Sequence, residues 1–314
     1  MLKFLSKIYR IFVQILCIPI FVSDYFKRQS GSEYRIGFWT KLAVLYKMAR
    51  NNCKIVSGSS FLEHVTMATT IMNIPKTLEG VVVECGSYKG VSAANLSLIC
   101  ALCDRKLEIF DSFQGLPEPS VKDNAHTLLS TREIHTYEKG SWCGTLDEVR
   151  QSITRYGRID VCNFNQGYFD QTLPKFKKKC VFAWLDVDLR ESLETCIKNL
   201  WPLLHDGCSL YTHEAAHLEI ASLFFSSEWW RENLSTLPPG LVGAGSGIGI
   251  KILSGAYFNS SMGYTIKNPK SAAFREVPQL GGLKLGVKTS LQLASPEKTK
   301  SAHVQKQSFE KLNR

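Results

Sequence analysis

Long apolar runs are scarce in this 314-residue sequence. Near its start, the apolar run from residue 11 to residue 22, broken by Gln14, is well short of the roughly 20 residues that a membrane-spanning helix needs. An Ala-x-Ala-like cleavage site is also missing after "FVSDYF", which weighs against a secretory signal. We therefore expect a cytoplasmic protein.

A cysteine framework is also missing, although the sequence holds ten cysteines. Cys100 and Cys103 form a single C-x-x-C pair, and no second pair follows at zinc-finger spacing. The other cysteines are scattered, several of them in apolar strands. We interpret them as buried, reduced thiols.

Net charge is nearly absent from the middle of the chain, although the whole sequence carries +10. Residues 1–28 hold five basic residues and one acidic residue, and residues 267–314 hold ten basic and three acidic residues. An enzyme of nucleic acids would be expected to concentrate positive charge around its active site. The distribution therefore disfavours a nucleic-acid partner and suits contact of the basic ends with an anionic membrane.

The basic residues of the N-terminal segment share one face of a predicted helix. Lys3, Lys7, Arg10 and Gln14 recur at helical spacing, and apolar residues occupy the remainder. Three interpretations fit this pattern. We favour an amphipathic anchor at the membrane interface; the alternatives are a helix packed on the core or on another subunit, and a targeting or spanning segment.

Strands and helices alternate through the middle of the chain, which is typical of parallel βαβ units in an α/β fold. Two upstream helices would cap the sheet, and a hairpin turning at 245–247 would close it. The predicted strands are 81–85, 106–113, 159–164, 180–188 and 208–214, and the predicted helices include 38–52, 61–75 and 191–204.

These patterns divide the chain into three parts. Residues 1–28 are the basic segment, and residues 29–266 form the α/β domain with its cap helices. Residues 267–314 are a basic extension, expected to be disordered from about residue 290.

The end of the first predicted strand suggests a nucleoside site, because ligands of open α/β sheets lie beyond the carboxyl ends of the strands. Glu84 precedes a loop in which Gly86 and Gly90 allow sharp turns and close approach of a ligand. Asp111 ends the second strand, where a carboxylate can accept both hydroxyls of a ribose. The G-x-G-x-x-G pattern of dinucleotide sites is missing, so S-adenosylmethionine fits better than NAD. The plain alternative is a glycine turn without a cofactor.

Four segments together resemble the macrocin-type (TylF-like) family of S-adenosylmethionine-dependent O-methyltransferases: "VVVECGSYKG", "IFDSFQGLPEP", "FNQGYFDQTLP" and "AWLDVDLRESLETCIKNLWPLLHDGCSLY". The resemblance covers about residues 60–255. It implies a class I methyltransferase (Rossmann-like) fold, with a seven-stranded sheet whose last strand is antiparallel and helices on both faces. It also implies methyl transfer to a hydroxyl of a sugar or glycoside.

The resemblance also assigns site residues. Loops 140–144 and 165–169 would lie near the nucleoside or the acceptor. Similar enzymes bind a divalent metal, usually Mg²⁺, through the first Asp of an "LDxDLY" block, here Asp186, and through an Asp-Asp pair, here replaced by His213 and Glu214. The implied cofactor-binding residues are Glu84, Gly86, Ser87, Gly90, Asp111 and Ser112.

The replacement of the Asp-Asp pair leaves three interpretations. Mg²⁺ prefers oxygen ligands, so Asp186, His213 and Glu214 could form a metal site with a preference shifted toward Mn²⁺, Fe²⁺ or Zn²⁺. His213 could instead be a metal-free general base, or the site could be degenerate. Asp186 and His213 are the predicted catalytic residues, and Asp188 is expected to be structural.

The segment "HEAAH", residues 213–217, also matches the HExxH pattern of zinc proteases. The pattern requires both histidines on one face of a helix, whereas His213 and Glu214 are predicted at a strand end. No third ligand stands at the spacing of the extended pattern. We interpret the match as chance.

Two rival functions and a set of partners complete the expectations. A cofactor-binding pseudoenzyme would explain the lost Asp-Asp pair. An RNA methyltransferase could use the basic tail, but the sequence lacks an Asn/Asp-Pro-Pro-aromatic motif. The expected partners are a small-molecule or lipid-linked glycan acceptor, a membrane surface in peripheral contact, and a second copy in a homo-oligomer.

Overall fold

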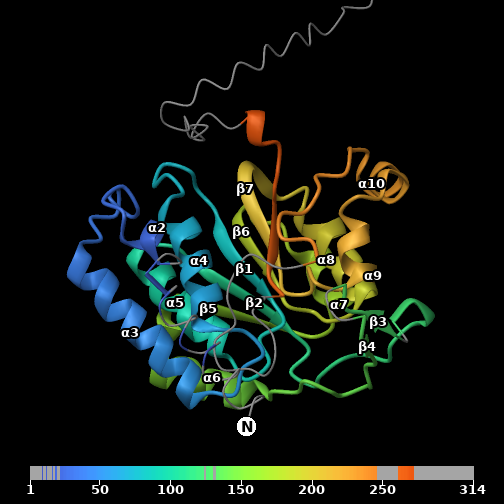
Figure 1. The fold of residues 1–314 in the computed structure, drawn as a ribbon, viewed down its shortest axis with the longest axis horizontal. Coiled ribbons are helices and arrows are strands. Elements are labelled where there is room, and N and C mark those ends of the chain that lie inside the picture. The colour runs from blue at the N-terminus through green and yellow to red at the C-terminus, as the bar shows by residue number, and fades with distance from the viewer. Residues whose placement is uncertain are drawn as a thin grey trace, which may run out of the picture. The chain divides into compact units, whose positions relative to one another are not determined.

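A central sheet organises the computed structural model, which describes residues 22–123, 125–129, 132–245 and 261–271 together with Tyr9, Phe12, Leu16, Ile18 and Pro19. Six strands lie in the order β5-β2-β1-β6-β7-β8, with helices around them (Figure 1). All neighbouring strands are parallel except β7 and β8. The strands are β1 (Val81–Cys85), β2 (Leu107–Asp111), β5 (Cys162–Gln166), β6 (Cys180–Leu185), β7 (Leu204–Thr212) and β8 (Gly263–Ile266).

The expected α/β fold with an antiparallel last strand is therefore confirmed, but the strand count differs. Within the described residues the central sheet has six strands, not seven. The closing strand is β8, which follows the hairpin predicted at 245–247. The part of that hairpin after Gly245 lies outside the described residues. In the part before Gly245, Val242 forms an isolated antiparallel bridge with Tyr264 of β8.

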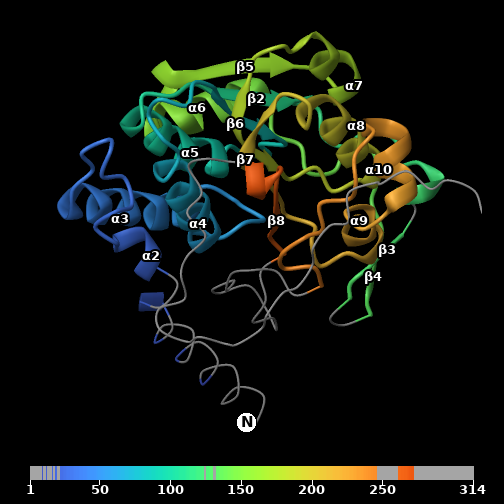
Figure 2. The same cartoon turned by 90° about the horizontal axis from the view of Figure 1, so that it is seen from above.

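Helices cover both faces of the sheet (Figure 2). One layer holds α3 to α6, with the short α2 packed against α3 and α4, and the opposite layer holds α7 to α10. The first layer is α2 (Ser23–Phe26), α3 (Phe38–Lys54), α4 (Phe61–Met72), α5 (Val91–Leu102) and α6 (Leu146–Tyr156). The second is α7 (Phe169–Thr172), α8 (Arg190–Leu200), α9 (Leu218–Leu223) and α10 (Ser227–Leu234).

A two-stranded antiparallel hairpin, β3 (His126–Thr127) and β4 (Ile134–His135), lies beside α9 and was not predicted. The backbone amide and hydroxyl of Thr127 donate to the Glu219 carboxylate on α9, at 2.7 and 3.1 Å. Four short 3₁₀ helices complete the described structure: η1 (Val121–Asp123), η2 (Ile159–Val161), η3 (Leu173–Lys175) and η4 (Pro269–Ser271).

Side chains cap the first turns of α4, α6 and α8. The Ser60 and Glu63 side chains form a capping box at the start of α4, and Thr145 and Glu148 do so at α6. The start of α8 is capped from a distant loop, because Asp123 accepts a 2.6 Å hydrogen bond from the Arg190 amide. These caps fix where each helix enters the layer.

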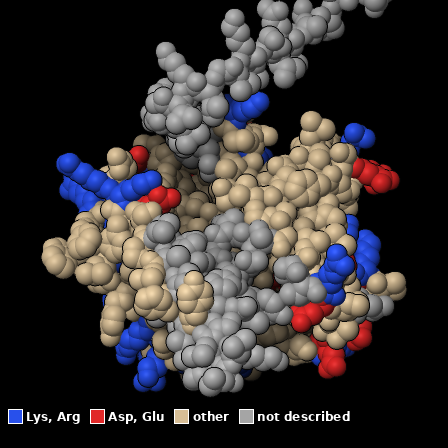
Figure 3. Space-filling view, in the orientation of Figure 1, with Lys and Arg blue, Asp and Glu red and all other residues tan. Residues whose placement is uncertain are grey.

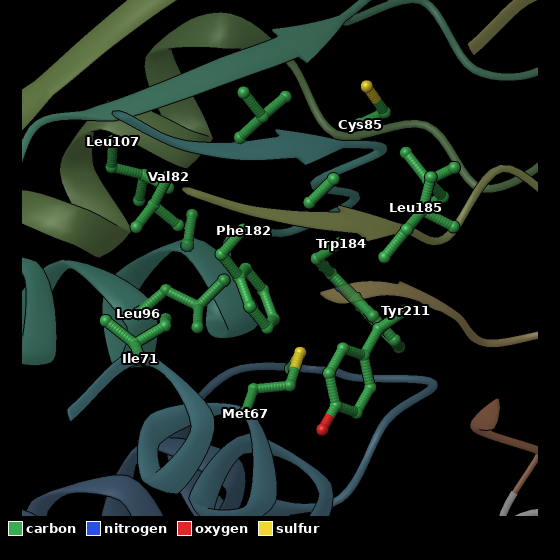
Figure 4. Close-up of a cluster of buried hydrophobic side chains, with 14 of the residues drawn as sticks. Met67, Ile71, Val82, Cys85, Leu96, Leu107, Phe182, Trp184, Leu185 and Tyr211 are labelled. Carbon is green, nitrogen blue, oxygen red and sulfur yellow. The ribbon is translucent and has the colours of Figure 1, made fainter. Parts of the chain in front are cut away.

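The hydrophobic core lies between the sheet and its helices. In the close-up of Figure 4, Phe182, Trp184 and Tyr211 point from β6 and β7 toward Met67 of α4. Phe182 is fully buried, and burying such a side chain stabilises the fold by roughly 1.5–3 kcal/mol. The Tyr211 hydroxyl also lies 2.7 Å from the Thr70 hydroxyl of α4. This packing sets α4 against the ends of β6 and β7.

The predicted N-terminal segment reaches the core at its end. Val22 and Tyr25 are buried, and the Tyr25 hydroxyl donates to the Lys41 carbonyl at 3.1 Å. Most of residues 1–21 and the tail predicted from residue 290 lie outside the described residues. Among the described helices, none has the length and hydropathy required to cross a bilayer.

Most of the described cysteines are buried, and none of them forms a disulfide. Cys100 and Cys103 form no disulfide. Burial raises the pKa of Cys100 well above its ordinary value, so this thiol stays protonated.

Candidate functional site

A crevice opens where the chain reverses its direction across the sheet. From β1 the chain proceeds to β2 and β5 on one side, and it then returns to β6 and β7 on the other. At the strand ends, the Asp186 amide donates to the Cys85 carbonyl at 2.9 Å. A cavity of about 260 Å³ lies beyond these ends, the usual ligand position in an open α/β sheet.

The glycine loop forms one wall of the cavity. Gly86 has a φ of +83°, and a Cβ there would overlap the carbonyl oxygen of Asp186. Gly90 has a φ of +85° and is the N-cap residue of α5. Both positions are therefore restricted to glycine in practice. At Gly86 the loop brings backbone, without a side chain, to the edge of the crevice.

Asp111 lies at the end of β2 and anchors the glycine loop. One carboxylate oxygen accepts the Ser87 amide and hydroxyl at 2.7 and 2.9 Å, and the other accepts the Phe113 amide at 2.7 Å. Burial raises the pKa of Asp111, and these hydrogen bonds offset only part of the shift. Ser112 binds within its own turn, because its hydroxyl donates to the Gly115 carbonyl at 2.8 Å.

The loop at 140–144 crosses the glycine loop. A Cβ on Gly144 would overlap the Tyr88 carbonyl oxygen, so the two loops are in direct backbone contact. The rings of Tyr88 and Trp142 meet edge to face at 5.5 Å. Trp142, with Tyr168 and Phe169 from the loop at 165–169, lines the cavity. The structure thus brings both predicted loops to the site.

Three cavity residues outside glycine positions have a left-handed backbone: Tyr88, Trp142 and Asp188, with φ of +47°, +56° and +57°. Each such conformation costs about 1 kcal/mol or more. Strained backbone of this kind concentrates at ligand sites.

Glu84 lies beneath the glycine loop and is not among the cavity-lining residues. It is fully buried, and neither carboxylate oxygen has a hydrogen-bond partner among the described residues. Burial raises its pKa to about 8, and the nearby Ser92 hydroxyl offsets part of this shift. A buried carboxyl group in this state is close to titration at neutral pH.

The opposite wall of the cavity holds Asp186, His213 and Glu214. His213 follows β7, and its Nδ1 lies 3.3 Å from Asp186 Oδ1. Its Nε2 lies 3.6 Å from Oε1 of Glu63, which comes from α4. Burial lowers the pKa of His213, but the two carboxylates outweigh burial and raise this pKa well above its ordinary value.

Glu214 is held by hydrogen bonds from the chain itself. Its Oε1 accepts the amides of Val187 and Asp188 at 3.1 and 3.2 Å, and its Oε2 accepts the Thr212 hydroxyl at 2.7 Å. Burial and the nearby Asp186 raise the pKa of Glu214 to about 7. Asp188 has a pKa raised well above its ordinary value by burial and by the charges of Glu214 and Asp186.

These three side chains fit a divalent cation by donor type and proximity. One ligand atom from each of Asp186, His213 and Glu214 lies within 4.8 Å of the other two. Two carboxylates and one imidazole suit Mn²⁺, Fe²⁺ or Zn²⁺ better than Mg²⁺. Glu214 already accepts three hydrogen bonds, so Asp186 and His213 are the more available donors.

His217 lies apart from this group, as expected for a chance HExxH match. No helix joins it to His213, because α9 begins only after His217. Its ring lies 5.4 Å from His135 and 5.6 Å from His126, and its Nδ1 lies 3.3 Å from the Tyr137 hydroxyl. Burial lowers the pKa of His217 to about 4.

The residues at the site that were not singled out from the sequence include Glu63, Tyr88, His135 and Tyr137. Tyr88 belongs to the quoted glycine loop, and Glu63 belongs to a readable S-x-x-E capping pattern. Neither local pattern shows that the Tyr88 side chain reaches the cavity or that the Glu63 side chain reaches His213. No sequence signal identifies His135 or Tyr137.

Comparison with known proteins decides the family. A sequence profile described as macrocin-O-methyltransferase (TylF) matches residues 53–216. The chain belongs to the macrocin O-methyltransferase family. A search of curated proteins finds no match.

The solved structure of NovP supports this fold. The O-methyltransferase NovP is 17% identical, with a TM-score of 0.51 over 70% of this chain and 88% of NovP. The calicheamicin methyltransferase CalS11 is 12% identical, with a TM-score of 0.47 over 72% of this chain and 92% of CalS11. With the family established, the protein is an S-adenosylmethionine-dependent O-methyltransferase of class I fold.

Proposed function

We propose that this macrocin-family methyltransferase transfers a methyl group from S-adenosylmethionine to a hydroxyl of a sugar or glycoside. One observation carries the proposal: a single cavity touches the glycine loop and Asp111 at one side, and Asp186 and His213 at the other. A cofactor and an acceptor bound there would share one enclosed space. The family resemblance supplies the sugar as acceptor, and the mixed aromatic and carboxylate lining suits a polyhydroxylated molecule.

The cofactor half of the cavity is assigned to Asp111 and the glycine loop. The Asp111 carboxylate is proposed to accept a ribose hydroxyl through Oδ1, which accepts only the Phe113 amide, whereas Oδ2 already accepts the amide and the hydroxyl of Ser87. Gly86 leaves backbone exposed at the cavity where the methionine portion would lie, and the buried Gly90 would shape the loop through its close approach to Val149 of α6. Glu84 would support that region from beneath, and Ser87 and Ser112 would hold the loops in place.

The acceptor half is assigned to Asp186 and His213. In the proposed step, His213 Nδ1 accepts the hydroxyl proton as the acceptor oxygen attacks the methyl carbon. The bond between carbon and sulfur breaks, and S-adenosylhomocysteine leaves. Because the sulfonium is already activated, alignment and removal of this proton are the main tasks of the protein.

A cation-assisted form of the same reaction is the second candidate, favoured by the proximity of the three donor atoms. Asp186, His213 and Glu214 would hold the cation. When bound, a divalent cation lowers the pKa of an acceptor hydroxyl. The two forms differ in their response to chelators.

The test is transfer of labelled methyl from S-adenosylmethionine to a panel of glycosides, with catechols as acceptors without a sugar. We expect incorporation into glycosides only, and the site of labelling can be read by mass spectrometry. Incorporation into catechols alone would contradict the sugar assignment. Cofactor binding without transfer to any acceptor would indicate the pseudoenzyme alternative.

Chelation separates the two proton-removal schemes. A metal-free reaction would keep its rate in EDTA. A cation-assisted reaction would lose its rate in EDTA and recover it on addition of Mn²⁺ more than of Mg²⁺, because of the His213 nitrogen.

A membrane-proximal acceptor, such as a lipid-linked glycan, is part of the proposal. It rests on the basic N-terminal segment, of which Tyr9, Phe12 and Leu16 are described and exposed. Basic and aromatic residues on one short helix are typical of an interfacial anchor.

A further inference from the structure

We infer that Glu63 of α4 is a positioning residue for His213, and that it fixes which imidazole nitrogen is available to the cavity. The inference rests on the proposed function of the same site. Glu63 and His213 are far apart in the sequence and meet only because α4 packs over the ends of β6 and β7.

The contact involves the buried nitrogen of His213. Glu63 is fully buried, and its Oε1 lies 3.6 Å from His213 Nε2, an ion-pair distance slightly beyond hydrogen-bond length. Nε2 is itself inaccessible to solvent and has no hydrogen-bond partner among the described residues. A buried imidazole N–H requires an acceptor, and Glu63 Oε1 is the group placed to supply it. Catalytic hydrogen bonds of this kind are often long before substrate binds.

Glu63 is held rigidly enough to orient the ring. Its Oε2 accepts the Ser60 amide at 2.6 Å in the capping box that starts α4. The carboxylate is thus divided, with one oxygen serving the helix and the other facing His213. The Trp184 ring meets the His213 ring at 5.7 Å and restricts it from another direction.

This arrangement determines the form of the neutral imidazole. A carboxylate faces each ring nitrogen, since Asp186 lies 3.3 Å from Nδ1 and Glu63 lies 3.6 Å from Nε2. Asp186 is partly exposed and shares the cavity with the acceptor, whereas Glu63 is fully buried, so we place the hydrogen of the neutral ring on Nε2 and the lone pair on Nδ1, where an acceptor hydroxyl or a cation would lie between Nδ1 and Asp186. A lone pair there can accept an acceptor proton or hold a cation. Either use needs the same carboxylate behind the ring, as in carboxylate–histidine pairs of hydrolases and metal sites.

The decisive variant is Glu63→Gln. The glutamine can still accept the Ser60 amide, so the cap is retained, but its NH₂ group would face Nε2 and donate to it. Nε2 would then lose its hydrogen, and the neutral form would carry it on Nδ1. We expect methyl transfer to glycosides to fall by about 10- to 100-fold, with the affinity for S-adenosylhomocysteine unchanged.

The direct readout is ¹⁵N NMR of histidine-labelled protein over a neutral to alkaline pH series. The His213 signal is assigned by its loss in His213→Gln. In the wild type we expect the neutral ring to be protonated at Nε2, and in Glu63→Gln at Nδ1. The same tautomer in both proteins, or a wild-type hydrogen on Nδ1, would overturn the inference.

The matched control is Ser60→Ala, which removes the hydroxyl of the cap without touching His213. We expect a lower melting temperature with the wild-type tautomer and pH profile. If this variant altered the tautomer as Glu63→Gln does, the effect would belong to the helix cap and the inference would fail. The NMR readout needs neither cofactor nor acceptor. Absence of transfer by the wild type would therefore contradict the proposed function alone.

Discussion

Gly86 and Asp186 lie side by side just beyond the ends of the paired strands β1 and β6, with no room for a side chain on Gly86. A Cβ on Gly86 would overlap the Asp186 carbonyl oxygen, and the Asp186 amide donates to the carbonyl of Cys85. The glycine loop and the acceptor wall are therefore joined through backbone. A change on one side of the crevice displaces the other.

Gly86→Ala is expected to impair both halves of the site. The added methyl must displace the backbone at Asp186, and the positive φ adds strain. We expect a lower melting temperature and at least about a tenfold loss of affinity for S-adenosylhomocysteine by calorimetry. Gly140→Ala is the matched control, because its φ is +79° but open space surrounds it. Equal losses in both variants would assign the effect to backbone strain alone.

Asp111→Asn is expected to weaken cofactor binding by about 10- to 100-fold, because a charged acceptor of the ribose and of the Ser87 amide becomes neutral. Calorimetric titration with S-adenosylhomocysteine measures the loss. Asp160→Asn, at an exposed ion pair with Arg158, is the control and should bind as the wild type does. Undiminished binding by Asp111→Asn would remove the nucleoside assignment.

Glu84→Gln is expected to stabilise the protein at alkaline pH. The folded pKa of about 8 lies above the ordinary value of 4.5, so the folded state binds the proton more tightly. Stability is therefore greatest at acid pH and declines as pH rises from about 4.5 through about 8. The neutral glutamine avoids this loss, and its melting temperature should exceed that of the wild type by several degrees at pH 9 but not at pH 5.

The control for this experiment is Glu118→Gln, whose side chain is exposed. It should follow the wild-type stability curve at both pH values. A Glu84→Gln curve parallel to that of the wild type would contradict the raised pKa.

Methyl transfer is expected to require alkaline pH in the metal-free scheme. Asp186 and Glu63 raise the pKa of His213, so its basic form is lost as pH falls through a range above the ordinary value of about 6.5. His213→Gln should reduce the rate by about 100-fold or more and abolish the rise with pH. His205→Gln, at the opposite end of β7, should retain the wild-type rate and its rise with pH. A flat wild-type profile would exclude His213 as the base.

Membrane contact is tested by removing residues 1–19, because Val22 and Tyr25 already belong to the core. Figure 3 shows Lys and Arg side chains at both edges of this face, among them the edge formed by α3 and by the loop between α2 and α3. We expect the full chain to sediment with vesicles that contain anionic lipid and the truncated chain to remain in the supernatant. Continued sedimentation of the truncated chain would show that another surface of the protein binds the vesicles.

The α/β alternation could be predicted because parallel strands are buried on both faces and appear as apolar runs, such as "VVVEC" and "CVFAWL". The glycine loop and Asp111 could also be predicted, since each depends on a local pattern at a strand end. β8 and the β3–β4 hairpin were missed because their strands are short and carry no clear alternation.

Of the two carboxylates that face His213, only Asp186 could be predicted from the sequence. Asp186 was found through a motif, whereas Glu63 carries a sufficient local explanation as a helix cap. Its second contact depends on how α4 packs against the sheet. Long-range packing of this kind leaves no periodicity in the sequence.

The β3–β4 hairpin contributes to the acceptor side but not to the cofactor loops. His135 and the following Tyr137 line the cavity, and the hairpin is fastened to α9 through Thr127 and Glu219. It is also joined to the segment after β7, because the Leu129 amide donates to the Ala216 carbonyl at 2.9 Å. The shape of the acceptor side therefore depends on two residues carried by a strand pair outside the central sheet, and their replacement is expected to change the choice of acceptor while the cofactor is bound as before.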